Sequence, residues 1–320
     1  MASLRSSALS NDPVAEEAAT ENLLGGGSAM SAALAGFFAS AGAYSGVLLG
    51  PLSILVAGVG SGVRAFDGRL CQPGLGIKRP RGFRDAEPVP RAAYVAVPTN
   101  ITAAAVALAY DDERSLGAVV KFGILRAERA GADARSALLQ VVRGMGAAAF
   151  SDPAFVRPLL HVAGTSEGGL LTPTDLARVP GDIEQAAVPF PEEPGWFETP
   201  WAAEAAALPV RSDSICLVTF DSKGVAAGVA YERCRDAVSF DTMELDAPRA
   251  AVPVLRGVTR VGPGERLSSA ANMAIRVEAG NALEIVASPN ASRFDPQRLA
   301  TPQLAIRRDP STRQLTLTRR

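Results

Sequence analysis

The first residue with catalytic potential is a serine at the start of an apolar run. Ser214 precedes residues 215–220, an apolar and β-branched stretch, and a turn at residues 221–224 leads into a second apolar run. This pattern predicts a β-hairpin with one strand buried on both faces. Proteins that cleave their own chain keep a hydroxyl there, because the freed α-amine then acts as base for it. The alternative is a polar residue that simply begins a strand.

The single histidine restricts the other catalytic chemistries. A Ser–His–Asp triad or a Cys–His pair would need His161, and a metal site of several histidines is impossible. We expect His161 to be buried or half-buried, because its neighbours are apolar and helix-like. Cys71, Cys216 and Cys234 are odd in number and lack CxxC spacing, which indicates reduced thiols. The sequence therefore predicts neither a metal site nor a cofactor.

The composition excludes several classes of partner. The 320 residues are 48% hydrophobic and carry a formal net charge of −1, which suits one or two globular domains. Broad binding to nucleic acid or to an anionic membrane would need a basic surplus. The longest apolar run, residues 46–62, is interrupted by Pro51 and by glycines, so it is too short to cross a bilayer. No apolar leader opens the chain, and we expect a cytoplasmic protein.

Helix and strand patterns predict an α+β protein built from stacked layers. Helices are expected at residues 13–24, 28–40, 100–110 and 116–150, the last with a break near 131–133. Strands are expected at 52–56, 94–98, 273–277 and 283–286, a turn at 66–68 and a linker at 180–209. Thr172, Pro173 and Asp175 have the spacing of a helix N-terminus with a capping box.

Several blocks, in the same order along the chain, resemble the γ-glutamyltranspeptidase family of N-terminal-nucleophile hydrolases. They are the helix and glycine segment at residues 12–35, the arginine block at 66–73, GGLLTPTDLA at 168–177, the nucleophile strand at 214–224, the serine pair at 268–269 and SPNASRF at 288–294. The resemblance implies an αββα layered sandwich formed by one domain, residues 1–320. Residues 1–213 would correspond to the large subunit and residues 214–320 to the small subunit.

The resemblance also implies roles for individual residues. Ser214 would be the nucleophile, which is a threonine in the family. Arg69 would bind the α-carboxylate of a γ-glutamyl group, as guanidinium groups suit carboxylates, and Ser268 and Ser269 would hydrogen-bond to the same group. The backbone N–H groups of residues 290 and 291 would form the oxyanion hole. From the residues alone, an arginine such as Arg69 is more often an exposed turn residue than a ligand contact, and a serine pair such as Ser268 and Ser269 more often stabilises a loop.

Departures from the family pattern fall in the pocket that the resemblance implies around Ser214. Cys216 replaces a histidine, Glu232 replaces a threonine, and Cys234 replaces an asparagine. Asn290 and Ala291 replace two glycines, and a Cβ there can deny the backbone geometry that an oxyanion hole needs. Since one oxyanion donor is worth roughly 100- to 1,000-fold in rate, these changes predict impaired or lost catalysis.

The sequence thus supports hydrolysis or transfer of γ-glutamyl amides such as glutathione, with a weakened active site, and a small γ-glutamyl or amino-acid-like ligand. Two alternatives stay open. One is a non-catalytic relative that acts as a binding or assembly module, and the other is an unrelated α+β binding protein. Family members are often exported, although no signal sequence is evident here. The sequence does not predict an oligomeric state.

Overall fold

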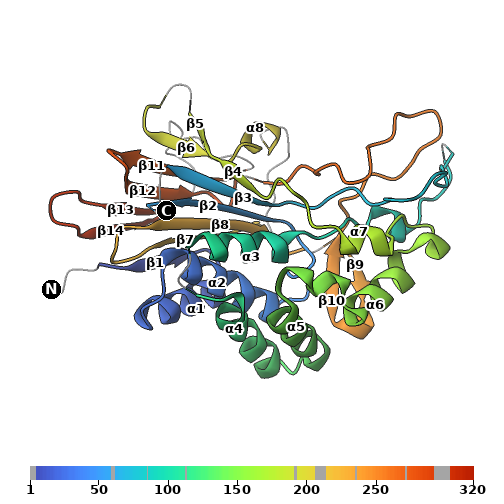
Figure 1. The fold of residues 1–320 in the computed structure, drawn as a ribbon, viewed down its shortest axis with the longest axis horizontal. Coiled ribbons are helices and arrows are strands. Elements are labelled where there is room, and N and C mark those ends of the chain that lie inside the picture. The colour runs from blue at the N-terminus through green and yellow to red at the C-terminus, as the bar shows by residue number, and fades with distance from the viewer. Residues whose placement is uncertain are drawn as a thin grey trace.

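The computed structural model describes residues 5–58, 62–84, 86–111, 114–190, 193–205, 214–234, 236–270, 272–291 and 303–320. It contains two six-stranded antiparallel sheets together with a group of helices, which confirms the α+β class (Figure 1).

The first sheet is built around the predicted hairpin. Its strands, in spatial order, are β1 (Ser7–Ser10), β7 (Ser214–Phe220), β8 (Ala226–Glu232), β2 (Leu52–Ala57), β3 (Val63–Gly68) and β4 (Glu184–Ala186). Every residue of β7 and β8 is buried, as the apolar runs predict. In the turn between them, Asp221 accepts the backbone N–H groups of Lys223, Gly224 and Val225. The order also shows that β7 and β8 lie between β1 and β2, which come from the first part of the chain.

The second sheet packs face to face with the first. Its order is β14 (Leu315–Arg319), β13 (Leu304–Arg308), β12 (Asn281–Ala287), β11 (Met273–Glu278), β6 (Trp196–Glu198) and β5 (Val188–Pro189). Cys216, Val218 and Phe220 of β7 share an apolar core with Ile275 and Ile285 of the second sheet. Side chains alternate along a strand, so the intervening residues of β7 point to the helical side.

Helices α1 (Pro13–Leu24), α2 (Ala29–Ala43) and α3 (Asn100–Asp111) cover the outer face of the first sheet, α4 (Leu116–Arg129) packs against α2, and α5 (Asp133–Met145) packs against α4 (Figure 1). Helices α6 (Pro153–Ala163) and α7 (Pro173–Ala177) lie beside the sheets. The single turn α8 (Ala202–Ala205) differs, since Ala202 and Ala205 belong to the core between the two sheets. The predicted capping box of α7 is present. Helix α2 is almost completely buried, and it crosses α4 where Gly42 meets Gly123. A Cβ on Gly42 would lie 1.9 Å from the Gly123 carbonyl oxygen, so the crossing requires glycine.

The outer face of the second sheet has a different cover. There Ala274, Val286 and Ala305 pack against Phe190 and Trp196, from the segment around β5 and β6. Within the described ranges, the layers are therefore helix, sheet and sheet, and the second helical layer of an αββα sandwich stays a prediction. No helix in these ranges combines the length and the hydropathy that a bilayer crossing requires.

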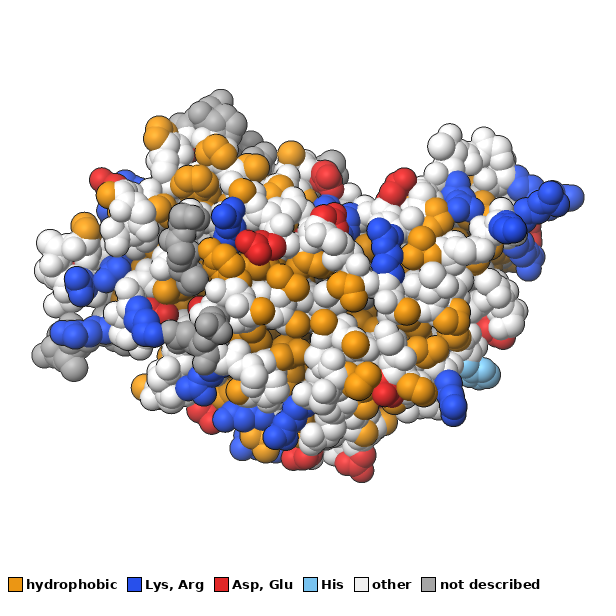
Figure 2. Space-filling model, in the orientation of Figure 1, with side chains coloured by type: hydrophobic (Ala, Val, Ile, Leu, Met, Phe, Trp, Pro, Cys, Tyr) orange, Lys and Arg blue, Asp and Glu red, His pale blue; other side chains and the backbone are white. Residues whose placement is uncertain are grey.

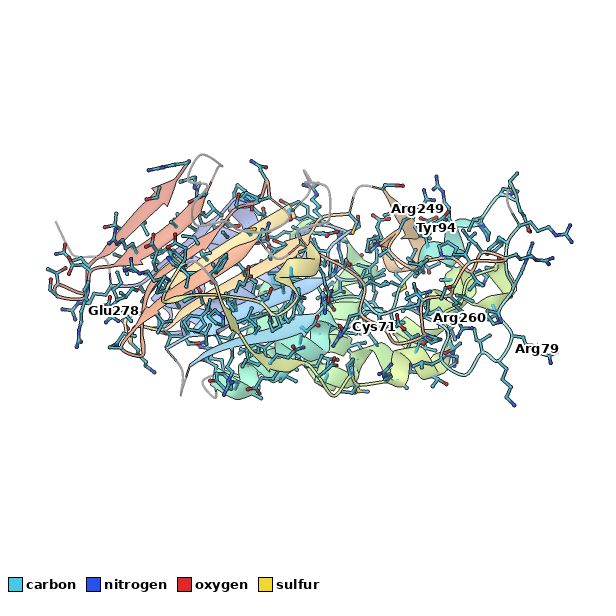
Figure 3. All side chains as sticks on the ribbon, turned by 90° about the horizontal axis from the view of Figure 1, so that it is seen from above. Cys71, Arg79, Tyr94, Arg249, Arg260 and Glu278 are labelled. Atoms are coloured by element: carbon cyan, nitrogen blue, oxygen red, sulfur yellow. The ribbon has the colours of Figure 1, made fainter. Side chains whose placement is uncertain are left out.

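Away from the sheets, an extended region carries short elements and loops. It contains the hairpin of β9 (Ala237–Phe240) and β10 (Leu245–Pro248) and the 3₁₀ turns η1 (Arg91–Tyr94), η2 (Gly146–Ser151), η3 (Thr165–Glu167) and η4 (Asp241–Met243). Figure 3 shows Tyr94 and Arg249 side by side here, and the Arg249 guanidinium carbon lies 4.3 Å from the Tyr94 ring centroid. Arg79 lies at the end of this region remote from the sheets, whereas Glu278 lies at the opposite end of the molecule.

Four local predictions were wrong. Residues 66–68 end strand β3 and form no turn, because Asp67 is neutralised by Arg69 and is buried. Residues 94–98 make only isolated bridges, at Val95 and Val97, because the 3₁₀ turn η1 ends at Tyr94 and Pro98 has no N–H group to continue a ladder. The expected linker at 180–209 contains β4, β5, β6 and α8 in its described part. His161 lies on the exposed side of α6, at the molecular surface in Figure 2.

Candidate functional site

Ser214 is the first residue of the central strand β7 and is only 3% exposed. It has the same parity as Cys216 and Val218, so its side chain points between the sheets rather than toward the helices. Asn11 fixes this end of the strand. Its side chain donates to the Ser214 carbonyl oxygen at 2.9 Å and accepts the Cys216 N–H at 2.8 Å.

Asn272, directly before β11, contacts Ser214 from the second sheet. Its Nδ2 lies 3.5 Å from Ser214 Oγ and 2.9 Å from the Ser288 carbonyl oxygen. Asn272 is fully buried, and its Oδ1 accepts no hydrogen bond in the described structure. A buried polar atom without a partner is costly. Asn272 was not predicted from the sequence, where its only signal is a polar residue directly before a predicted strand.

The register of the first sheet shows that Arg69 and Ser214 lie at the same end of it. One row of paired residues runs from Gly68 to Leu52, then to Tyr231 and to Ile215. Arg69 and Ser214 each come one residue beyond this row. Two strands separate them, which corresponds to about 14 Å at the usual strand spacing.

Arg69 is already engaged by two carboxylates. Its Nη2 lies 3.0 Å from Asp67 Oδ2, and its Nη1 lies 2.5 Å from Glu204 Oε2. The guanidinium carbon also lies 5.1 Å from the centre of the Trp201 ring. Burial alone would lower the pKa of Arg69, but Asp67 and Glu204 raise it above the ordinary value. Arg69 is thus the cation of an internal ion pair, and a substrate carboxylate would have to compete for it.

The predicted serine pair lies on a segment that connects these two places. Leu267 N–H donates to the Leu70 carbonyl oxygen at 2.8 Å, beside Arg69, and five residues later Asn272 contacts Ser214. Ser268 is exposed and Ser269 is 6% exposed. The segment therefore lies at the end of the sheets that carries Ser214 and Arg69, and the roles of the two serines stay predictions.

The predicted oxyanion residues follow the end of β12. Ser288 and Asn272 are held together through their backbones, since Ser288 N–H donates to the Asn272 carbonyl oxygen at 2.9 Å. Ala291 N–H donates to the Ser288 carbonyl oxygen at 3.2 Å and so closes a local turn. Asn290 is exposed, and neither Asn290 nor Ala291 has a positive φ. One of the two predicted donors is thus occupied within the turn.

Cys216 is an unsuitable nucleophile. The side chain is completely buried, and burial raises the pKa of its thiol to about 12, although the adjacent Asn272 amide opposes this shift. The thiolate is the reactive form of cysteine. The thiol of Cys216 is therefore held in its unreactive, protonated form.

Nowhere among the residues that the structure describes do three or more His, Cys, Asp or Glu side chains gather in a way that could hold a metal ion.

Several solved structures are similar to this chain. Cephalosporin acylase from Bacillus halodurans aligns with a TM-score of 0.72 at 12% identity, over 99% of this chain and 94% of that one. LmbA2991T421A aligns with a TM-score of 0.67 at 13% identity, over 100% of this chain and 97% of that one. Helicobacter pylori γ-glutamyltranspeptidase aligns over 57% of this chain and 66% of that one at 17% identity, and its TM-score of 0.43 is too low to support an argument.

Together with the two facing antiparallel sheets, the first two alignments show an N-terminal-nucleophile-hydrolase-like fold. At 12–13% identity, this likeness concerns the fold alone. A scan against protein-family models and a search of curated proteins each found no match.

Proposed function

We propose that this protein is a γ-glutamyltranspeptidase-like amide hydrolase with a weakened active site. Ser214 is its nucleophile, freed by cleavage of the peptide bond before it, so that residues 1–213 and 214–320 become two associated subunits. Its substrates are γ-glutamyl amides, which it hydrolyses or transfers slowly.

The observation that carries the proposal is the position of Ser214. A buried hydroxyl begins the central strand, points between two sheets and meets the Asn272 amide. In self-cleavage, Ser214 Oγ attacks the carbonyl carbon of residue 213 and the C–N bond breaks, which leaves an ester and a free α-amine. Water then hydrolyses the ester. The unpartnered Oδ1 of Asn272 is a suitable acceptor for the new amine.

In catalysis, the same amine takes the Oγ proton while Oγ attacks the substrate carbonyl carbon. The leaving amine departs with that proton, and water or a second amine releases the acyl group. Two features support a slow reaction. Arg69 is held by Asp67 and Glu204, and Ala291 N–H is occupied by the Ser288 carbonyl oxygen.

Self-cleavage is tested by mass spectrometry on the denatured protein. We expect two fragments in place of the 33.1 kDa chain, and an intact chain for Ser214→Ala. Ser222→Ala is the matched control, since Ser222 lies exposed in the turn at the far end of β7. An intact wild-type chain, or a cut that persists in Ser214→Ala, would exclude this role for Ser214.

Catalysis is tested with a chromogenic γ-glutamyl anilide. We expect slow turnover by the wild type and by Ser222→Ala, and none by Ser214→Ala. If the cleaved protein hydrolysed other amides but not γ-glutamyl anilides, the role of Ser214 as nucleophile would stand and the proposed substrate class would be wrong.

A non-catalytic binding module is the second candidate, and the internal ion pair of Arg69 favours it. An intact, cooperatively folded chain without turnover is the result that would select this alternative.

A further inference from the structure

A cleft of about 700 Å³ lies between the end of α2, the start of α5 and the β9–β10 hairpin. Arg233 follows β8, and its guanidinium carbon lies 3.9 Å from the centre of the Tyr44 ring, directly after α2. The cleft is therefore on the helical side of the first sheet, whereas Ser214 points to the other side.

Arg135 lines this cleft and has no partner. The residue is only 7% exposed, and its Nε is buried without a hydrogen-bond acceptor. The described structure contains no ion pair to its guanidinium. Burial lowers the pKa of Arg135, and Glu244 and Asp246 oppose that shift from a distance. Almost all buried charges in proteins are paired, so an unpartnered buried arginine that lines a cleft points to a missing anion.

The acidic residues nearby are held in other interactions. Glu244 Oε2 accepts the backbone N–H groups of Ala134 and Arg135 at 3.0 and 3.3 Å and so caps α5. Asp246 accepts the hydroxyls of Ser45 and Ser239 at 2.5 and 2.7 Å. Neither carboxylate is within ion-pair distance of Arg135.

The charge balance favours one kind of anion. Asp241, Glu244 and Asp246 also line the cleft, and their combined charge disfavours a dianion such as phosphate more than a singly charged carboxylate. A carboxylate matches the guanidinium group through two parallel hydrogen bonds. Phe240 and Leu245 supply apolar wall for the remainder of such a ligand.

We propose that this cleft is a binding site for the carboxylate group of a small molecule, held by Arg135 with Arg233 at its rim. The proposal does not rest on the amide hydrolysis proposed above, although Cys234, which the family resemblance assigns to the substrate pocket, also lines this cleft.

The test is calorimetric titration of the full chain with acetate, glutarate, L-glutamate and inorganic phosphate. We expect saturable binding of at least one of the three carboxylates, and binding roughly ten-fold or more weaker in Arg135→Met, because a hydrogen bond to a charged group is lost. Arg143→Met is the matched control, since Arg143 is exposed near the other end of α5. Arg233→Met, at an exposed position, supplies a second variant that leaves the core intact.

Ser214→Ala should bind these carboxylates as the wild type does, which separates this site from the proposed catalytic one. The proposal would be overturned if no carboxylate showed saturable binding. It would also be overturned if the wild type, Arg135→Met and Arg233→Met bound equally well. Tighter binding of phosphate than of every carboxylate is the third result that would overturn it.

Discussion

Arg69 and Arg135 are both almost completely buried, at 6% and 7% exposure, yet their surroundings are opposite. Arg69 lies between the carboxylates of Asp67 and Glu204 and over the Trp201 ring. Arg135 lines a cleft without any ion pair in the described structure. The first arginine belongs to the internal structure, and the second is available to a ligand.

The two arginines show that a residue's position in the family resemblance differs from what its side chain is free to bind. Arg69 occupies the position where the family resemblance predicts a substrate-binding arginine, but its hydrogen bonds are already made. Arg135 belongs to no block of the resemblance, and it has the unmet hydrogen-bonding capacity that a binding site requires.

The largest expected effect is on the internal ion pair. Asp67 is fully buried, lies 3.0 Å from Arg69 and 3.5 Å from Arg266, and accepts the Arg69 backbone N–H. Asp67→Ala should lower the free energy of unfolding by about 3–5 kcal/mol, because it leaves buried positive charge without a partner. Urea denaturation measures this change. A loss below about 1 kcal/mol would mean that Arg69 does not depend on Asp67.

A second variant should release Arg69 for substrate. The Glu204 side chain is 58% exposed and engages only one side of the Arg69 guanidinium. Glu204→Gln removes the competing charge, so the kcat/KM for a γ-glutamyl anilide should rise roughly ten-fold, the value of one charged hydrogen bond. The stability should change by less than about 1 kcal/mol, as for an exposed ion pair. Unchanged kinetics in an active protein would argue that Arg69 does not bind the substrate.

In the cleft lined by Arg135, Glu244 is expected to stabilise α5. Its carboxylate replaces a conventional cap, since the N-cap residue Ala132 has no side-chain acceptor. Glu244→Ala should cost about 1 kcal/mol in thermal or urea unfolding. The control Asp241→Ala, at an exposed position of the same hairpin, should stay within about 0.5 kcal/mol of the wild type. Equal losses in the two variants would show that the cap contributes nothing specific.

The smallest effect should come from Arg135 itself. Arg135→Met removes a buried charge that has no partner, so the stability should change by less than about 1 kcal/mol or should rise. Urea denaturation of the ligand-free protein measures this change in stability. A loss of 3 kcal/mol or more would put Arg135 in the same structural role as Arg69 and would end the contrast between them.

The sequence predicted the elements whose signals are local. Ser214 and the hairpin after it follow from an apolar run and a turn, and α1 follows from Asp12 and Pro13, which cap and open it. The prediction for Asp67 was wrong because the residues that neutralise it include Arg266, far along the chain. Local patterns cannot show such a partner.

The two unmet polar groups could not be predicted for the same reason. Asn272 becomes a candidate site residue only because β11 brings it to Ser214. Arg135 becomes one only because the β9–β10 hairpin reaches the start of α5. Both depend on contacts between residues that are distant in the sequence. The roles that the family resemblance implies nevertheless require Ser214, Arg69 and the 268–269 segment to lie at one end of the sheets.

The strand order has a practical consequence for any nicked form of this protein. The strands β7 and β8 are inserted between β1 and β2. The two pieces of a chain broken before Ser214 would therefore stay associated through two complete ladders of backbone hydrogen bonds. The two pieces would co-migrate in gel filtration and separate only after denaturation. An apparently intact particle in native buffer would therefore carry no information about whether the backbone is continuous.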